Sequence, residues 1–174
     1  MKVLLFNGSS QSDGLNARAL NQISQLLVDN HQVITDEVNN YVLPFYDESI
    51  DKHEINTILS SLTSKISISD ILIIAIPEFN GSYPAKFKNL YDWLSVISSR
   101  YFSIGAWLNK NIIVVSATPG KRGGQDVLAA AKSSFNYNGG KTVLTVSLPE
   151  FSRNSIFTDE QQEEILRKIE YFRK

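Results

Sequence analysis

Residues 71–93, ILIIAIPEFNGSYPAKFKNLYDW, decide the fold. The first six side chains are all aliphatic and do not alternate with polar ones, which is typical of a strand buried on both faces of a sheet. Pro77 cannot donate a ladder hydrogen bond, so we expect the strand to end there. Asn80 and Gly81 then supply turn residues that tolerate a positive φ. This part of the stretch predicts a buried parallel strand and a short polar loop.

A helix is expected after the loop. Ser82 is placed to cap it, and Pro84 falls in its first turn, where a missing N–H does no harm. The spacing of the apolar residues that follow gives one stripe on the helix surface. The stripe consists of Phe87, Leu90, Tyr91 and Leu94. In open α/β sheets, ligands bind in the crevice beyond strand ends of this kind.

The same strand–loop–helix pattern extends over the whole chain. Further strands are expected at residues 2–6, 31–37, 111–117 and 142–148, and further helices at 15–28, 52–66, 125–135 and 158–172. Five strands alternating with five helices predict a three-layer α/β fold with a parallel sheet and right-handed crossovers. We expect a single domain over residues 1–174. The periodicity leaves the strand order open between the two common doubly wound arrangements.

Composition excludes several classes of function. The 174 residues are 43% apolar and 20% charged, as in ordinary globular domains. A net charge of −1 gives no electrostatic reason to expect nucleic acid or a membrane as partner. The absence of cysteine excludes disulfides, thiolate metal sites and a cysteine nucleophile. His31 and His53 stand too far apart in sequence to suggest a metal site, so we expect none.

The N-terminal residues bear on location. Only four apolar residues separate Met1-Lys2 from Asn7-Gly8, which is too short for the core of a signal peptide. Every apolar run is also far shorter than the roughly 20 residues needed to span a bilayer. The expected location is therefore cytoplasmic.

Three loops suited to ligand contact follow the first, third and fourth expected strands. They comprise residues 8–12, 78–81 and 118–120. The first leads into a helix N-terminus, where free N–H groups and the helix dipole favour an anion such as phosphate. It matches neither the GxGxxG dinucleotide fingerprint nor the Walker lysine pattern. Taken singly, each loop is more simply a turn; three such loops at one sheet edge favour a ligand.

Three motifs carry a resemblance to a known family. They are GSSQSDGLN at residues 8–16, PEFNGSYPA at 77–85 with Lys88-Asn89 and Asp92-Trp93 beyond it, and the strand end with glycine loop at 116–124. With them the chain resembles the NADPH-dependent FMN reductases, flavodoxin-like flavoproteins that include quinone and azo-dye reductases. The resemblance covers nearly the whole chain, and the middle motif is its most specific part.

The resemblance implies a flavodoxin-like sheet of order 2-1-3-4-5, one FMN per chain, and a homodimer or homotetramer. Hydride would pass from NADPH or NADH through FMN to a quinone, flavin or similar small acceptor, without a catalytic side chain. The implied alternative is an FMN-binding electron carrier that does not react with NAD(P)H. The implied cofactor residues are Ser9, Gln11, Leu15 and Asn16 at the phosphate, Pro77, Glu78, Phe79, Asn80 and Gly81 along the isoalloxazine, and Ser116, Thr118, Gly120 and Gly123 on its other side.

The chain departs from the family pattern at three positions. Gln11 stands where the family commonly has arginine, Gly14 where it often has serine, and Phe79 where tyrosine is common. Arginine offers phosphate a permanent charge and a planar fork of donors, whereas glutamine offers one neutral amide. Lys121 and Arg122 are candidates for the phosphates of a nicotinamide cofactor, with solvent exposure as the alternative reading.

Overall fold

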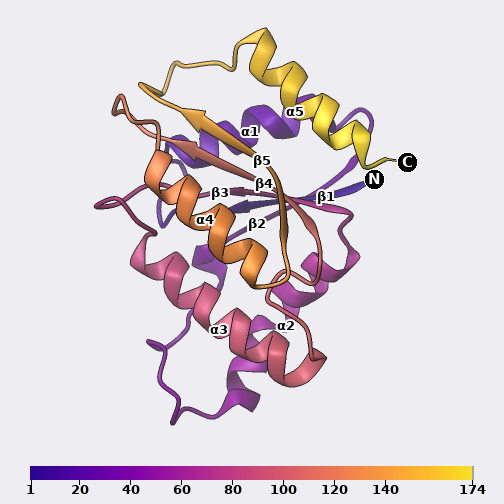
Figure 1. Cartoon of the computed structure of the whole chain (residues 1–174), viewed down its shortest axis with the longest axis vertical. Helices are drawn as coiled ribbons and strands as arrows, with labels where there is room; N and C mark the ends of the chain where they lie inside the picture. Colours follow the sequence, from indigo (N-terminus) through magenta and orange to yellow (C-terminus); the bar gives the residue numbers. More distant parts are fainter. Residues whose placement is uncertain (174) are drawn as a thin grey trace.

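The computed structural model describes residues 1–173 and shows a parallel sheet between two layers of helices (Figure 1). The strands are β1 (Lys2–Asn7), β2 (Gln32–Glu37), β3 (Ile71–Ala75), β4 (Asn111–Ala117) and β5 (Lys141–Leu148). The helices are α1 (Leu15–Leu27), α2 (Lys52–Ile68), α3 (Ala85–Phe102), α4 (Gln125–Tyr137) and α5 (Asp159–Tyr171), with a short 3-10 turn η1 at Val38–Asn40. The expected elements are therefore confirmed.

The sheet has the order β2-β1-β3-β4-β5, and every neighbouring pair is parallel. This confirms the flavodoxin-like order that the family resemblance implied. Figure 1 shows α1 and α5 on one face of the sheet and α2, α3 and α4 on the other. All five carboxyl ends of the strands therefore point to one edge, and the connections that lead from them into helices form the surface of that edge.

The two faces of β3 explain its unbroken apolar run. Ile71, Ile73 and Ala75 belong to the apolar cluster beneath α1 and α5, whereas Leu72 and Ile74 belong to the cluster beneath α2, α3 and α4. All five side chains are buried. A strand buried on both faces needs no polar alternation, which is why the sequence pattern predicts it well.

The expected cap at Ser82 is wrong. Residues 79–82 form a tight two-residue turn in which the backbones of Phe79 and Ser82 exchange N–H···O bonds of 3.0 Å. Asn80 and Gly81 occupy its centre with φ of 52° and 73°, as an Asn-Gly pair favours. The turn uses the backbone of Ser82, and the residue that precedes α3 is Pro84, which has no side-chain cap.

Two other helices begin at a residue whose side chain caps them. The carboxylate of Asp51 accepts the N–H of His53 at 2.9 Å and caps α2. Thr158 and Gln161 form a reciprocal capping box at the start of α5. None of the helices within residues 1–173 combines the length and the apolar character that crossing a membrane requires.

Candidate functional site

The three candidate loops are joined to one another at the carboxyl edge of the sheet. The N–H of Gly8 donates to the carbonyl of Ala75 at the end of β3, over 2.8 Å. The side chain of Asn16 bridges the backbone of Ala117 at the end of β4, with both bonds at 3.0 Å. These contacts hold the start of α1 against the ends of β3 and β4, so the sequence-predicted convergence is real.

The first loop folds around its own polar side chains. Asn7 Oδ1 accepts the N–H of Ser9 at 3.0 Å, and Ser9 Oγ accepts the N–H of Gln11 at 3.1 Å. Gly8 is required because an added Cβ would lie 2.9 Å from the ring of Phe87. The loop is thus packed on the core and has a defined shape.

The N-terminus of α1 opens toward this loop. The residue before the helix, Gly14, has no side chain to cap it, and the first helical bond runs from Arg18 N–H to Gly14 O over 3.0 Å. The N–H groups of residues 15–17 precede that bond and have no acceptor within the helix. An anion placed here would meet these N–H groups and the positive end of the helix dipole.

The four predicted phosphate residues differ in how they are placed. Gln11 is exposed and its side chain lies over Gly14, so its amide is available at the helix start. Ser9 is buried, and its hydroxyl already accepts the N–H of Gln11. Asn16 is buried with its amide committed to Ala117, which leaves its backbone N–H for a ligand, as at the half-buried Leu15.

Glu78 connects the second loop to the third. Its Oε2 accepts the N–H groups of Asp126 and Val127 at 2.9 and 3.1 Å and so caps the start of α4. A negatively charged carboxylate at this position interacts favourably with the positive end of the helix dipole. Pro77 beside it is buried, which leaves the turn beyond as the exposed part of this loop. Glu78 therefore fixes the distance between the two loops.

The tip of the second loop is open to solvent. Asn80 and Gly81 are exposed, and the ring of Phe79 is 51% exposed. An aromatic ring half out of the core on a rigid turn offers a flat apolar surface to a planar ligand. The turn therefore has both the shape and the chemistry of a platform.

The third loop divides into a supporting part and an open part. Ser116 is fully buried beneath Gly124, and Gly123 is buried with its carbonyl accepting Ser147 Oγ at 2.8 Å. Ser116 and Gly123 thus pack the loop on β4 and β5, and their contacts with a ligand stay a prediction. By contrast, an added Cβ at Gly120 would meet nothing within 4 Å, and Thr118 is half-exposed.

The charged residues of the third loop are also partly engaged. Arg122 forms an ion pair with Asp126, one turn away at the start of α4. Lys121 is exposed beside it. Of this pair, Lys121 is therefore the better placed to meet an incoming phosphate.

Tyr83 follows the turn in sequence, and its half-buried side chain is directed to α4, where its hydroxyl contacts Ser134. Burial raises the pKa of Tyr83 to about 12, although its contact with Ser134 Oγ at 2.6 Å acts in the opposite direction. The phenol is therefore protonated at neutral pH.

Among residues 1–173, no three His, Cys, Asp or Glu side chains gather closely enough to hold a metal ion.

Comparison with known proteins agrees with this geometry. The family model for the NADPH-dependent FMN reductases matches residues 1–152. A quinone reductase from Pseudomonas putida is 28% identical over 128 residues, which are 74% of this chain and 66% of that protein. An NAD(P)H-dependent FMN reductase from Pseudomonas aeruginosa is 26% identical over 71% of this chain and 63% of its own length. The chain thus spans slightly less than two thirds of these relatives.

A solved structure shows the same fold over the full length. The flavoenzyme NAD(P)H:(acceptor) oxidoreductase FerB from Paracoccus denitrificans superimposes with a TM-score of 0.78 at 21% identity, covering 99% of this chain and 97% of that one. A short-chain flavodoxin aligns with a TM-score of 0.63 at 13% identity over 98% and 97% of the two chains. The chain belongs to the NADPH-dependent FMN reductase family.

Proposed function

We propose that the chain is an FMN-dependent NAD(P)H oxidoreductase that reduces a quinone, a flavin or a similar small acceptor. The observation that carries the proposal is the joining of three ligand-type loops at the uncapped N-terminus of α1. Family membership supports it, as do the relatives described as quinone and FMN reductases.

The residues present fit FMN in three places. The uncapped first turn of α1 and the exposed amide of Gln11 offer donors to a phosphate. The turn at Phe79, Asn80 and Gly81 offers a ring and backbone groups to the isoalloxazine. The open space at Gly120, beside Thr118, leaves room on the other side.

Bound FMN would supply the redox chemistry, taking hydride from a nicotinamide cofactor and passing electrons to the acceptor. The protein's own contribution is position and polarity. Glu78 holds the platform against α4, and Asn16 holds α1 against β4. Backbone N–H groups near Asn80 and Gly120 would face the pyrimidine edge, where reduction places negative charge.

The visible absorption spectrum of the purified protein tests the proposal. After incubation with FMN and desalting, we expect retained flavin bands that bleach when NADPH or NADH is added without oxygen. Bands that persist with both cofactors but bleach with dithionite would indicate an electron carrier instead. A protein that retains no flavin would refute the cofactor assignment.

Asn80 provides a sharper test of the platform. Because its φ is 52°, alanine there would strain the turn as well as remove the amide, whereas glycine removes only the amide. We expect Asn80→Gly, which keeps the turn and its backbone groups, to change FMN affinity little, and Asn80→Ala, which strains the turn, to weaken it severalfold, measured by flavin fluorescence titration. Equal affinity in all three proteins would contradict this placement.

The proposal includes assembly into a homodimer or homotetramer in the cytoplasm. The loop before α2 supports assembly, because Val42 and Phe45 are 84% and 85% exposed. This loop is not loose: Pro44 O accepts Trp93 Nε1 and Asn89 Nδ2, both at 2.9 Å. A phenylalanine presented rigidly to solvent suits a contact between subunits.

We therefore expect Phe45→Ser to shift the protein toward the monomer. Multi-angle light scattering across a dilution series would measure the shift. Tyr137→Ser is the matched control, because that ring is 89% exposed at the far end of α4. A change in both variants, or in neither, would locate the interface elsewhere.

A further inference from the structure

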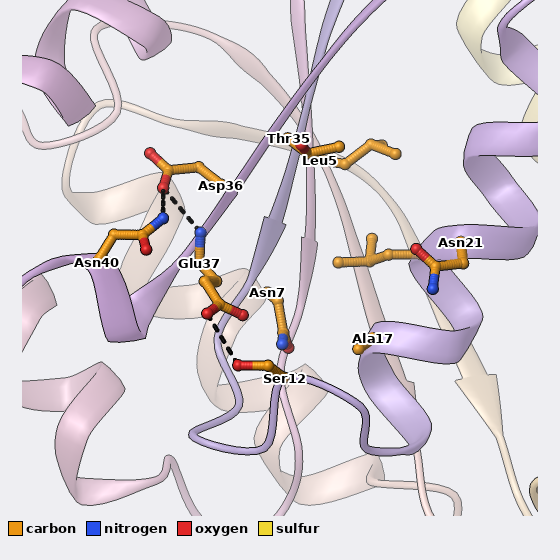
Figure 2. Close-up of a pocket in the computed structure, with 10 residues that line it drawn as sticks. Leu5, Asn7, Ser12, Ala17, Asn21, Thr35, Asp36, Glu37 and Asn40 are labelled. Atoms are coloured by element: carbon orange, nitrogen blue, oxygen red, sulfur yellow. Dashed lines mark hydrogen bonds between the residues drawn. The ribbon is translucent and has the colours of Figure 1, made fainter.

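A cavity lies between α1 and β2 (Figure 2). It is beside the first loop and away from the loops that follow β3 and β4. Its volume is about 240 Å³. The strand β2 is at the edge of the sheet, so no further strand closes this side. The cavity is lined by Leu5, Asn7, Ser12, Ala17, Leu20, Asn21, Thr35, Asp36, Glu37 and Asn40. No lining residue comes from the loops that follow β3 or β4.

The lining has an apolar part and a polar part. Leu5, Ala17 and Leu20 are buried side chains of β1 and α1. Figure 2 shows Thr35, Asn21 and Glu37 arranged around the opening, with Asn7 and Ser12 at the loop end. A ligand that fills this space must therefore present both an apolar surface and polar groups.

The charge in the cavity comes from Glu37. Its Oε1 accepts the hydroxyl of Ser12 at 2.8 Å and leaves Oε2 for a ligand. The neighbouring carboxylate of Asp36 is already neutralised, since its Oδ2 accepts Lys65 Nζ at 2.9 Å. A negatively charged ligand would be repelled by Glu37, so phosphates are disfavoured here.

The hydrogen-bonding groups narrow the ligand further. Asn21 and Thr35 are exposed at the rim, and an amide or a hydroxyl can both donate and accept. An ammonium group can only donate, so it could bind Glu37 but could not accept from the amide of Asn21 or the hydroxyl of Thr35. Hydroxyl groups match both kinds of partner at once.

We propose that this cavity binds a sugar ring that carries a vicinal diol. The two hydroxyls would donate to the carboxylate of Glu37, and the C–H face of the ring would lie on Leu5 and Leu20. Acidic residues at the end of the second strand accept ribose hydroxyls in the same way in dinucleotide-binding α/β sheets. The volume is below the roughly 300 Å³ at which drug-sized pockets begin, and so suits one sugar ring.

The proposal does not rest on the proposed flavin site, although the first loop borders both sites, and it is tested separately. Amide chemical shifts of ¹⁵N-labelled protein, with and without added FMN, would be followed during titration with D-ribose, adenosine and 2′-deoxyadenosine. We expect ribose or adenosine to shift the amides of Asn7, Asn21, Thr35 and Glu37 in both forms. Adenosine should bind at least fivefold more tightly than 2′-deoxyadenosine.

The three probes also distinguish the source of the sugar. Shifts with ribose and adenosine alike indicate that the ring suffices, and shifts with adenosine alone indicate a nucleoside. Equal affinity for adenosine and its 2′-deoxy form would overturn the proposal. Shifts confined to the loops after β3 and β4, or no shifts at millimolar probe, would overturn it as well.

Variants on α1 and β2 complete the test. Asn21→Leu replaces an exposed amide at the rim, and we expect it to weaken adenosine binding about tenfold. Gln25→Leu is the matched control, because Gln25 is exposed on the same helix but does not line the cavity. Glu37→Gln retains an acceptor for Ser12 and should weaken binding similarly. An unchanged affinity in both Asn21→Leu and Glu37→Gln would refute the site.

Discussion

Replacing Asp36 with alanine is expected to lower the free energy of unfolding by about 3 kcal/mol, because it breaks a buried ion pair. The Asp36 carboxylate is fully buried and pairs with Lys65 Nζ at 2.9 Å. It also accepts the hydroxyl of Tyr41 at 2.5 Å, the amide of Asn40 at 2.7 Å and the N–H of Glu37 at 2.8 Å. We place the loss at the low end of the range for buried pairs because the side chain of Lys65 is 31% exposed and can turn toward water.

Urea unfolding at pH 7 would measure this loss. Asp29→Ala serves as the control, since Asp29 is exposed just after α1, and it should change the free energy of unfolding by less than about 0.5 kcal/mol. A small effect of Asp36→Ala would mean that Tyr41 and Lys65 find other partners. It would also mean that the end of β2 does not depend on this network.

The same network predicts how stability varies with pH. Burial alone would raise the pKa of Asp36, but hydrogen bonds from Lys65, Tyr41, Asn40 and the Glu37 N–H together lower it below 3.8. A carboxyl whose folded pKa is lowered stabilises the protein above its unfolded pKa and loses this effect as the pH falls through the folded value. The difference between wild type and Asp36→Ala should be constant from pH 5 to 8 and shrink below about pH 4.

Strands were the part of the fold most open to prediction from sequence. The unbroken apolar run at 71–76 predicts a strand buried between two layers of helices. Residues 112–117 predict a second strand of the same kind. The order of the strands has no such local signal, because it depends on which crossover each helix makes. The prediction of the order 2-1-3-4-5 came from the family resemblance instead.

The site was predictable in its loops but not in the contacts that hold them. Glu78 bonds to Val127, 49 positions away, and Asn16 bonds to Ala117, 101 positions away. Neither contact has a periodic pattern that sequence reasoning could detect. Ser82 shows the opposite error, since a good local cap signal was overridden by the stronger preference of Asn80-Gly81 for a tight turn.

The cavity at β2 was missed for a related reason. Thr35 and Glu37 read as ordinary residues of a short strand. Their position at the sheet edge, opposite Asn21, follows only from the strand order. The available signal was the group of polar residues at the end of this strand, namely Thr35, Asp36, Glu37, Asn39 and Asn40.

Replacing Gln11 with arginine is expected to increase the affinity for FMN about tenfold. Gln11 lies beside the first turn of α1, where the other donors to a phosphate are neutral N–H groups. Arg18, on the first turn of α1, donates to the backbone carbonyl of Asp13 at 3.2 Å, and Arg153 forms an ion pair with the Asp13 carboxylate at 4.0 Å, so both cations already have a partner. A guanidinium at position 11 would add charge-assisted hydrogen bonds, each stronger than that of a neutral amide by about 1 kcal/mol or more.

Riboflavin gives this prediction its control, because it has the same ring system without the phosphate. Fluorescence titration should show that Gln11→Arg strengthens FMN binding, increasingly so at low salt, and leaves riboflavin binding unchanged. Gln25→Arg adds the same charge to α1 away from the loop and should change neither affinity. An equal gain for both flavins would mean that position 11 contacts the ring system and not the phosphate. No gain for either flavin would mean that the phosphate does not bind at the start of α1. The assignment of all four phosphate residues would then be wrong.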